Sequence, residues 1–176
     1  SDIGNESDQV GRNLMFHLQT LALGFFPDRL HSHRGRSVTH LFDDPIVPDV
    51  SARTAAGDAG IPYFRGGIVE LGGPGGPIME AVHLPSGPFH SSAMLNSMTR
   101  DKMAVLCMQG EDLPQATNRI DLDPTVKDVF GFASGRVTYT PHRHEVACAE
   151  HWAPRFSQLM RDAGATGTHW VTSPPL

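Results

Sequence analysis

The sequence predicts an α+β fold in which helices flank a mostly antiparallel β-sheet. Short runs of alternating or continuous apolar residues, which are typical of strands, recur along the chain. Glycine (18 residues) and proline (14 residues) punctuate these runs, as frequent turns require. One long stretch of helical periodicity follows the strand patterns. Strands grouped ahead of a helix are characteristic of the α+β class.

Composition and charge narrow the classes of function. The 176 residues suffice for one domain with a sizeable core, and the formal net charge of −5 without a basic stripe argues against nucleic-acid binding. No apolar run of about 18 residues occurs, so no membrane span is expected. Residues 1–10 lack the basic and apolar regions of a signal peptide, which leaves the cytoplasm as the default expectation. Cys107 and Cys148 lie in apolar runs and are expected to be buried thiols.

The first part of the chain predicts strands separated by loops. Residues 13–26 form a dense apolar run, which is expected to be a strand buried on both faces. Residues 37–44 alternate and predict a short strand, and residues 63–73 predict a strand that ends at glycines. Residues 52–60 are small and polar and predict a mobile loop.

The middle of the chain predicts one short helix and further strands. Residues 91–101 begin with serine and carry methionine and leucine at helical spacing, which predicts an amphipathic helix with a serine cap. Residues 102–110 form an apolar run that predicts a central strand. One sheet is expected to combine residues 37–44, 63–73, 102–110, 118–123 and 135–140.

The clearest helix covers residues 144–165. Its apolar residues fall on one stripe at steps of three and four, and Gly164 is expected to end it. Pro154 lies inside the pattern, so the straight portion is expected to begin near Ala153, with a looser turn before it. No element is predicted for residues 168–176, which run into two prolines.

Three segments, in order, resemble the glucose–methanol–choline family of FAD-dependent oxidoreductases. "VGRNLMFH" (residues 10–17) is similar to the family's turn V-G-x-N-L-x-D-H, with Phe16 in place of the aspartate. "EDLPQATNRIDLDPTVKDVFG" (residues 111–131) resembles its acidic Leu-Pro turn followed by Asn-Arg-x-x-Leu-Asp-Pro, the most specific of the motifs. Residues 136–165 resemble the strand and helix that follow.

The resemblance implies an internal part of a flavoenzyme that oxidises the CH–OH group of a small-molecule alcohol. The cofactor would be FAD, and Gly11, Asn13 and His17 are then expected beside the flavin. The implied organisation is a connection from the flavin-binding domain (1–30), a substrate-binding sheet domain (31–142) and a helix returning toward the flavin domain (143–176).

Candidate substrate contacts follow from alternation along two predicted strands. If one face of these strands points at the flavin ring, its side chains form an apolar wall of the pocket. The candidate wall residues are Tyr63, Phe64, Met103, Val105 and Cys107.

Two parts of the family's machinery have no counterpart in the sequence. The Gly-rich stretch at residues 72–77 has the wrong spacing for a Gly-x-Gly-x-x-Gly turn, and Pro74 and Pro77 have no N–H for a pyrophosphate. The family's catalytic histidine pair follows the long helix, in a Ser-Arg-His and Gly-Thr context that this sequence lacks. We therefore assign no catalytic residue and expect the chain by itself to be inactive and to hold FAD weakly.

Other classes of function receive less support. Both histidine groups lie beside arginines, which disfavour a bound dication, so no metal site is expected. The His90-Ser91-Ser92 sequence lacks the Gly-x-Ser-x-Gly turn of hydrolases. A stand-alone, non-catalytic small-molecule or protein binding module with an antiparallel sheet stays the alternative, and the oligomeric state is not predicted. The two histidine groups are His31, His33 and His40, and His142, His144 and His151.

Overall fold

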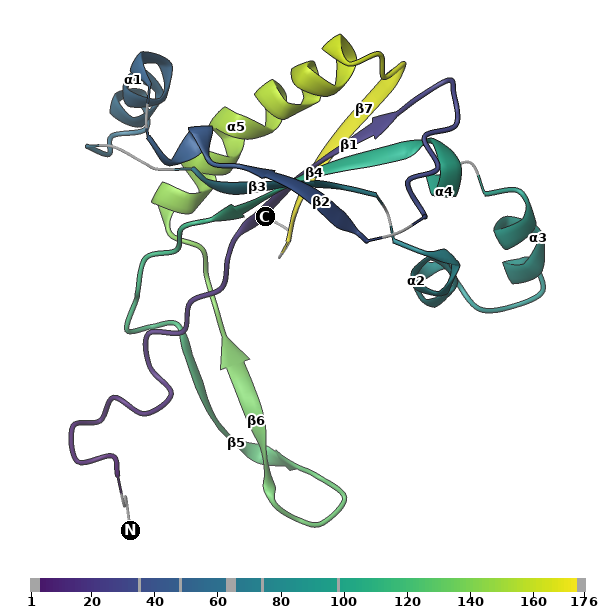
Figure 1. Ribbon diagram of the computed structural model, residues 1–176. Coiled ribbons are helices and arrows are strands. Elements are labelled where there is room, and N and C mark those ends of the chain that lie inside the picture. Colours follow the sequence, from purple (N-terminus) through teal and green to yellow (C-terminus); the bar gives the residue numbers. More distant parts are fainter. Residues whose placement is uncertain are drawn as a thin grey trace.

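The computed structural model describes residues 4–34, 36–47, 49–62, 66–73, 75–97 and 99–173. These residues form a five-stranded sheet with a long helix against one face, a separate two-stranded hairpin and several short helices (Figure 1). The predicted α+β class with a mostly antiparallel sheet is confirmed.

The five-stranded sheet has the spatial order β2-β3-β4-β1-β7, and each neighbouring pair is antiparallel. Strand β4 is central, and its neighbour β1 pairs Leu21 with Cys107 of β4 on one side and with Val171 of β7 on the other. Residues that are paired in this way share one face of the sheet, so the register decides which side chains meet. The strands are β1 (Gln19–Phe25), β2 (Val38–Phe42), β3 (Gly67–Gly72), β4 (Met103–Gly110) and β7 (Gly167–Ser173).

The predicted composition of the sheet is right for β2, β3 and β4 and wrong on the other side of β4. The segments near 118–123 and 135–140 become β5 (Arg119–Lys127) and β6 (Ala133–Thr138), which pair only with each other as a second sheet. Their places in the main sheet are taken by β1 and by β7, for which no element was predicted. Alternation of apolar and polar residues indicates that one side of a strand is buried, but it does not identify the neighbouring strand. Strand β1 also alternates between buried and partly buried residues, so it is not buried on both faces.

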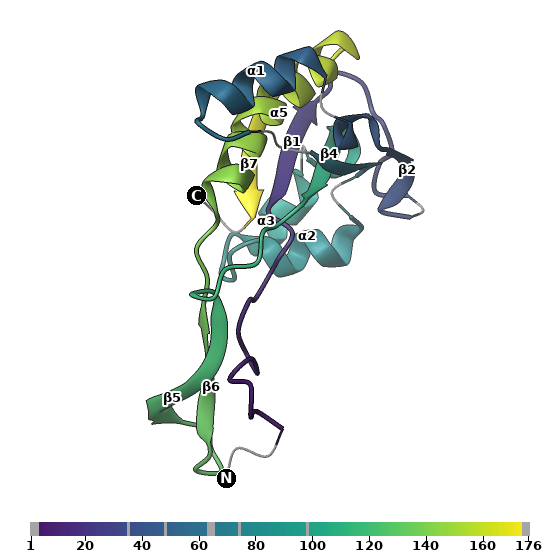
Figure 2. The same cartoon turned by 90° about the vertical axis from the view of Figure 1, so that its left-hand side faces the viewer.

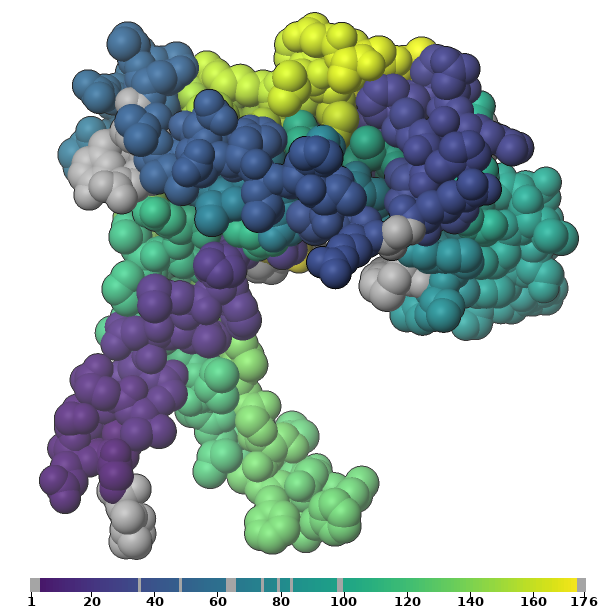
Figure 3. Space-filling model, viewed as in Figure 1, coloured from purple at the N-terminus to yellow at the C-terminus, as the bar shows by residue number. Residues whose placement is uncertain are grey.

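The β5–β6 hairpin stands away from the body of the molecule beside the N-terminal strap, residues 8–16 (Figure 3). Strap and hairpin are joined where the Ile120 N–H donates to the Gly11 carbonyl (2.7 Å) and the Leu14 N–H donates to the Asn118 carbonyl (2.9 Å). An isolated two-stranded hairpin is only marginally stable in water, and so large a group of exposed apolar side chains marks an interaction surface. The exposed apolar residues of the hairpin are Ile120, Leu122, Val126, Val129, Phe130, Phe132 and Val137.

Helix α5 (Arg143–Asp162) packs on the sheet and makes the core. Its residues Phe156 and Met160 are buried together with Ala22 and Leu106 of β1 and β4. The small residues of β1 let the helix approach closely. A Cβ atom on Gly24 would lie only 2.9 Å from Met160 Sδ, so β1 is shaped to fit the helix.

The predicted start of the long helix near Ala153 is wrong, because α5 begins ten residues earlier with a complete capping box. The His142 side chain accepts the N–H of His144, and the Glu145 carboxylate accepts the N–H of His142. Pro154 lies inside the helix, where it removes one backbone hydrogen bond. Helix α5 nevertheless runs from Arg143 to Asp162, and the Arg155 guanidinium donates to the nearby His151 carbonyl (2.6 Å).

The short helices revise two further predictions. Residues 52–60, predicted as a mobile loop, lie mostly in α1, whose N-cap Asp49 accepts the N–H of Ala52 (2.7 Å). The predicted helix at 91–101 is divided into α3 and α4, and within the described residues no side chain caps α3, which begins directly after Phe89. The elements are η1 (Asp44–Ile46), α1 (Val50–Asp58), α2 (Pro77–His83), α3 (His90–Leu95) and α4 (Thr99–Lys102). Among the described residues, no helix has the length and apolar character that a membrane span requires.

The substitution Glu145→Gln tests the start of α5. The Glu145 carboxylate is 3% exposed and also accepts the N–H of Leu113 (2.8 Å), so each of its oxygens faces a backbone donor. A glutamine would turn an NH₂ group toward one of them, and we expect the free energy of unfolding to fall by roughly 1–3 kcal/mol. Urea denaturation followed by circular dichroism measures it. Glu150→Gln, at an exposed position of the same helix, is the matched control and should change stability by less than about 0.5 kcal/mol.

Candidate functional site

The two faces of the five-stranded sheet differ in what covers them. Among the described elements, α5 packs closely on β1, β4 and β7, and it lies on the same side of the sheet as α1 (Figure 2). On β4, Leu106 and Met108 face this helix and are 2% and 1% exposed. Val105 and Cys107, which alternate with them, are only partly buried. The described chain therefore leaves the second face incompletely covered.

We call this second surface the open face, and it is mainly apolar. Antiparallel pairing places Leu21 beside Cys107 and Leu23 beside Val105, so the side chains of β1 and β4 form a continuous surface. Ile68 of β3, which is 45% exposed, extends this surface toward the edge of the sheet. A wall of this composition is typical of sites for small organic ligands.

The structure places three of the five predicted wall residues on the open face. Met103, Val105 and Cys107 alternate along β4 on the side away from α5. Their contact with a substrate stays a prediction. Tyr63 and Phe64 lie outside the described residues.

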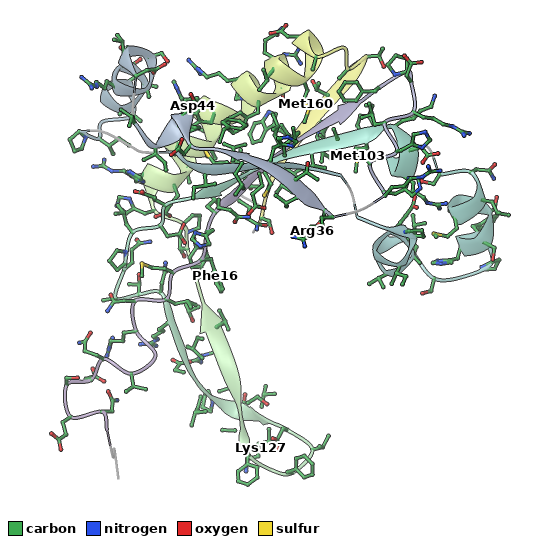
Figure 4. The ribbon with its side chains drawn as sticks, in the orientation of Figure 1. Phe16, Arg36, Asp44, Met103, Lys127 and Met160 are labelled. Atoms are coloured by element: carbon green, nitrogen blue, oxygen red, sulfur yellow. The ribbon has the colours of Figure 1, made fainter. Side chains whose placement is uncertain are left out.

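A cavity of about 930 Å³ opens at one end of the open face, where β3 and β4 meet the strap. Figure 4 shows Phe16 at this place, between the sheet and the hairpin. The volume of the cavity is in the range of small-molecule sites, about 300–1,000 Å³. The apolar residues that line it are Met15, Phe16, Leu41, Ile46 and Ile68, and the polar ones are His17, Glu70, Gln109, Glu111 and Asp112.

His17 is the one predicted cofactor-binding residue that lines this cavity. Its Nδ1 atom lies 3.1 Å from the Gly110 carbonyl oxygen. A carbonyl can only accept, so Nδ1 carries the proton of the neutral ring and Nε2 keeps its lone pair. His17 thus offers one hydrogen-bond acceptor that can also take up a proton.

Gly11 and Asn13 do not line the cavity, and both have structural roles in the strap. Gly11 has φ +79°, and a Cβ atom there would lie 2.1 Å from the Ile120 carbonyl oxygen. Asn13 also has a left-handed backbone (φ 57°), which asparagine tolerates better than most residues, and its amide donates to Gln9. Their predicted place beside a cofactor stays a prediction.

Phe16 occupies the position of the family's aspartate and packs on Tyr139. The two rings meet edge to face with centroids 5.0 Å apart. The Tyr139 hydroxyl donates to Asp112 (3.0 Å), and burial, followed by this hydrogen bond, raises the pKa of Tyr139 well above its usual value. Asp112 also accepts the N–H of Leu18 (3.0 Å), so this carboxylate joins the start of β1 to the base of the hairpin.

Three polar side chains cross the open face at its cavity end, and the sequence analysis did not identify them. Gln19 Nε2 donates to Gln109 Oε1 (3.0 Å), and Gln109 Nε2 donates to Glu70 Oε2 (3.4 Å). They lie on the neighbouring strands β1, β4 and β3. The available signal was one polar residue in each of the apolar patterns of β3 and β4, and the pair Gln19-Thr20 at the start of β1. Only the register shows that the three are adjacent.

The histidine groups form no metal site in the structure. Throughout the described ranges, no set of three or more His, Cys, Asp or Glu side chains could hold a metal ion. His33 Nδ1 lies 2.7 Å from an Asp101 carboxylate oxygen, and the His151 ring meets the Trp152 ring edge to face. Contact with a carboxylate and contact with an aromatic ring therefore account for these two histidines.

Comparison with known proteins finds a similarity to a dehydrogenase. The chain is 28% identical, over 179 aligned positions, to the 2-methyl-1,2-propanediol dehydrogenase of Mycolicibacterium austroafricanum. The alignment covers 98% of this chain and 31% of that protein, so the chain spans about a third of the length of this relative. No protein-family model matches the chain.

The substitution Gly11→Ala tests how the strap holds the hairpin. The new methyl group would need a left-handed backbone and would meet the Ile120 carbonyl, so we expect the free energy of unfolding to fall by roughly 1–3 kcal/mol. Gly57→Ala is the control, since Gly57 lies in α1 with no atom within 4 Å of the added Cβ. That variant should be neutral or more stable by up to about 1 kcal/mol. Equal effects of the two substitutions would contradict the proposed packing of the strap.

The reactivity of the thiols tests the assignment of Cys107 to the open face and of Cys148 to the core. Burial, and then the nearby Glu70 carboxylate, raise the pKa of Cys107 to about 11. Only the thiolate reacts, so at pH 8 iodoacetamide should alkylate Cys107 roughly 100-fold more slowly than an unperturbed thiol. Cys148 is 3% exposed, and its pKa is raised to about 12, so it should react later still. Peptide mass spectrometry gives both rates, and unfolding in urea should make them equal. Faster alkylation of Cys148 in the folded protein would show that the assigned faces are wrong.

Proposed function

We propose that this chain is part of an FAD-dependent oxidoreductase of the glucose–methanol–choline type, which oxidises a CH–OH group of a small alcohol. The open face and the cavity would form one wall of the substrate site. The observation that carries the proposal is this cavity at the end of an apolar sheet face, in a chain that aligns along 98% of its length with a diol dehydrogenase. The three sequence segments that resemble the family support the same assignment.

The described residues fit one side of a flavin site. The open face is apolar, and the alternation of β4 presents Val105 and Cys107 together on it. Such a surface suits contact with the flat aromatic ring system of a flavin. The sequence has no Gly-x-Gly-x-x-Gly turn, so polypeptide outside this chain would bind the pyrophosphate. The larger part of the related dehydrogenase lies outside the alignment, which leaves room for such a region. The exposed apolar hairpin offers a surface on which that region could pack.

Within this proposal, the residues of the cavity bind and orient the alcohol. FAD, when bound, would supply the acceptor for the hydride that leaves the carbinol carbon. His17 Nε2 can accept a hydrogen bond or a proton from a hydroxyl group, since Nδ1 is held by the Gly110 carbonyl. Glu70 and Gln109 offer polar contacts that fix orientation, while Ile68 and Phe16 exclude water.

The test uses the protein at the length at which its own gene encodes it. Purified protein should carry bound flavin, and 1,2-propanediol added without oxygen should bleach the flavin absorbance. The chain 1–176 alone should bind FAD weakly and oxidise no alcohol. Full-length protein without flavin, or with flavin that no alcohol reduces, would contradict the proposal and favour a non-catalytic binding module.

The substitution Ile68→Asp tests the role of the open face in this reaction. A charge at this apolar position of the cavity should weaken alcohol binding, and we expect kcat/KM to fall roughly tenfold or more. Leu159→Asp is the matched control, because Leu159 is 49% exposed on α5, close to the 45% of Ile68. Steady-state rates with an artificial electron acceptor measure both variants. An unchanged kcat/KM in Ile68→Asp would show that the open face is not part of the alcohol-binding site.

A further inference from the structure

The row Gln19–Gln109–Glu70 has fixed hydrogen-bond directions. A carboxylate can only accept, so Gln109 must turn its NH₂ group toward Glu70. The Gln109 carbonyl oxygen then faces Gln19, which must donate through its own NH₂ group (3.0 Å). The chemistry of Glu70 therefore sets the orientation of both amides, and the row does not depend on a choice of amide flip.

Acceptor capacity is left over in this row. Only one Glu70 oxygen receives a hydrogen bond from the described residues, and the Gln19 carbonyl oxygen receives none. Both residues are partly buried beside apolar side chains, and water can still reach the free oxygens, so a donor group of a ligand can take the place of that water. Glu70 and Gln109 line the cavity, so a ligand there can supply the missing donors.

The charges around the cavity also favour a ligand that donates hydrogen bonds. Its described lining contains Glu70, Glu111 and Asp112, and neither lysine nor arginine. Both Asp112 oxygens are already used, by the Leu18 N–H and the Tyr139 hydroxyl, and Glu111 is solvent-exposed. Glu70 is thus the carboxylate that a ligand would meet on the open face. An anionic ligand would bring acceptors and a negative charge to a surface that already has both.

We propose that Glu70, oriented by Gln109 and Gln19, makes this cavity select an alcohol that has a second hydrogen-bond donor and no negative charge, such as a small diol or amino alcohol. Hydroxy acids are excluded by the same carboxylate. The statement that the selected diol is oxidised rests on the proposed function. The selectivity of binding follows from the row and the cavity alone.

Three ligands with one carbon skeleton test the selectivity. 1,2-Propanediol, lactate and 1-amino-2-propanol share a 2-hydroxypropyl frame and end in a hydroxyl, a carboxylate and an ammonium group. Dissociation constants come from ligand-detected NMR titration of the protein at its natural length. Lactate should bind at least roughly tenfold more weakly than the diol, the size of effect expected from one hydrogen bond to a charged group. 1-Amino-2-propanol should bind at least as tightly as the diol, because its ammonium group also donates to Glu70.

Two substitutions at Glu70 provide the decisive comparison. Glu70→Gln should reduce the preference for diol over lactate by roughly tenfold, and Glu70→Lys should make lactate the tighter ligand. Glu150→Gln and Glu150→Lys make the same changes at an exposed position of α5 and should leave the preference unchanged. Gln19→Leu removes the support of the row and keeps the charge, so it should weaken diol binding without admitting lactate. Circular dichroism confirms that each variant is folded.

Several outcomes would overturn this inference. They are no measurable binding of the diol, binding of lactate as tight as that of the diol, weaker binding of the amino alcohol than of lactate, or a preference that Glu70→Gln does not change. The proposed function fails separately. Diol selectivity in a protein without flavin would refute the oxidoreductase and leave the selectivity in place. Flavin-dependent oxidation of lactate and diol at equal kcat/KM would refute only the selectivity.

Discussion

The packing of α5 against one face of the sheet is the constraint on which the other features depend. Gly24 leaves only enough room for Met160, and the buried Leu106 and Met108 fix the side of β4 that the helix covers. Because side chains alternate in a strand, this contact sends Val105 and Cys107 to the opposite face. The antiparallel register then aligns them with Leu21 and Leu23 of β1. The open face is thus a direct consequence of where the helix lies.

Two parts of the structure leave apolar surface exposed to water. The open face and the β5–β6 hairpin both present apolar side chains that the described residues do not cover. Monomeric domains seldom leave this much apolar surface in contact with water. The related dehydrogenase is about three times as long as this chain. Under the proposed function, further polypeptide and a flavin would cover these two surfaces, which Tyr139 and Asp112 join to each other.

The sequence predicted the local elements better than their neighbours. The strand patterns of β2, β3 and β4 and the helical stripe of α5 were visible, since each is a periodic pattern within a few residues. The order of the strands was missed, because β1 and β7 meet only through contacts between residues about 150 positions apart. The row at Glu70 was missed for the same reason. Pro154 misled the prediction of the helix start, because the capping box of His142 and Glu145 outweighs one lost backbone hydrogen bond.

The account depends on the open face being the wall of a flavin site. An experimental structure of the protein at its natural length, purified with whatever cofactor it retains, tests this most directly. The account predicts a flavin ring system opposite the β1–β4 surface, with Val105 and Cys107 on the side that faces it. A structure in which ordinary side chains of the same protein fill that surface and the cavity, with no room for a cofactor or a small ligand, would contradict it.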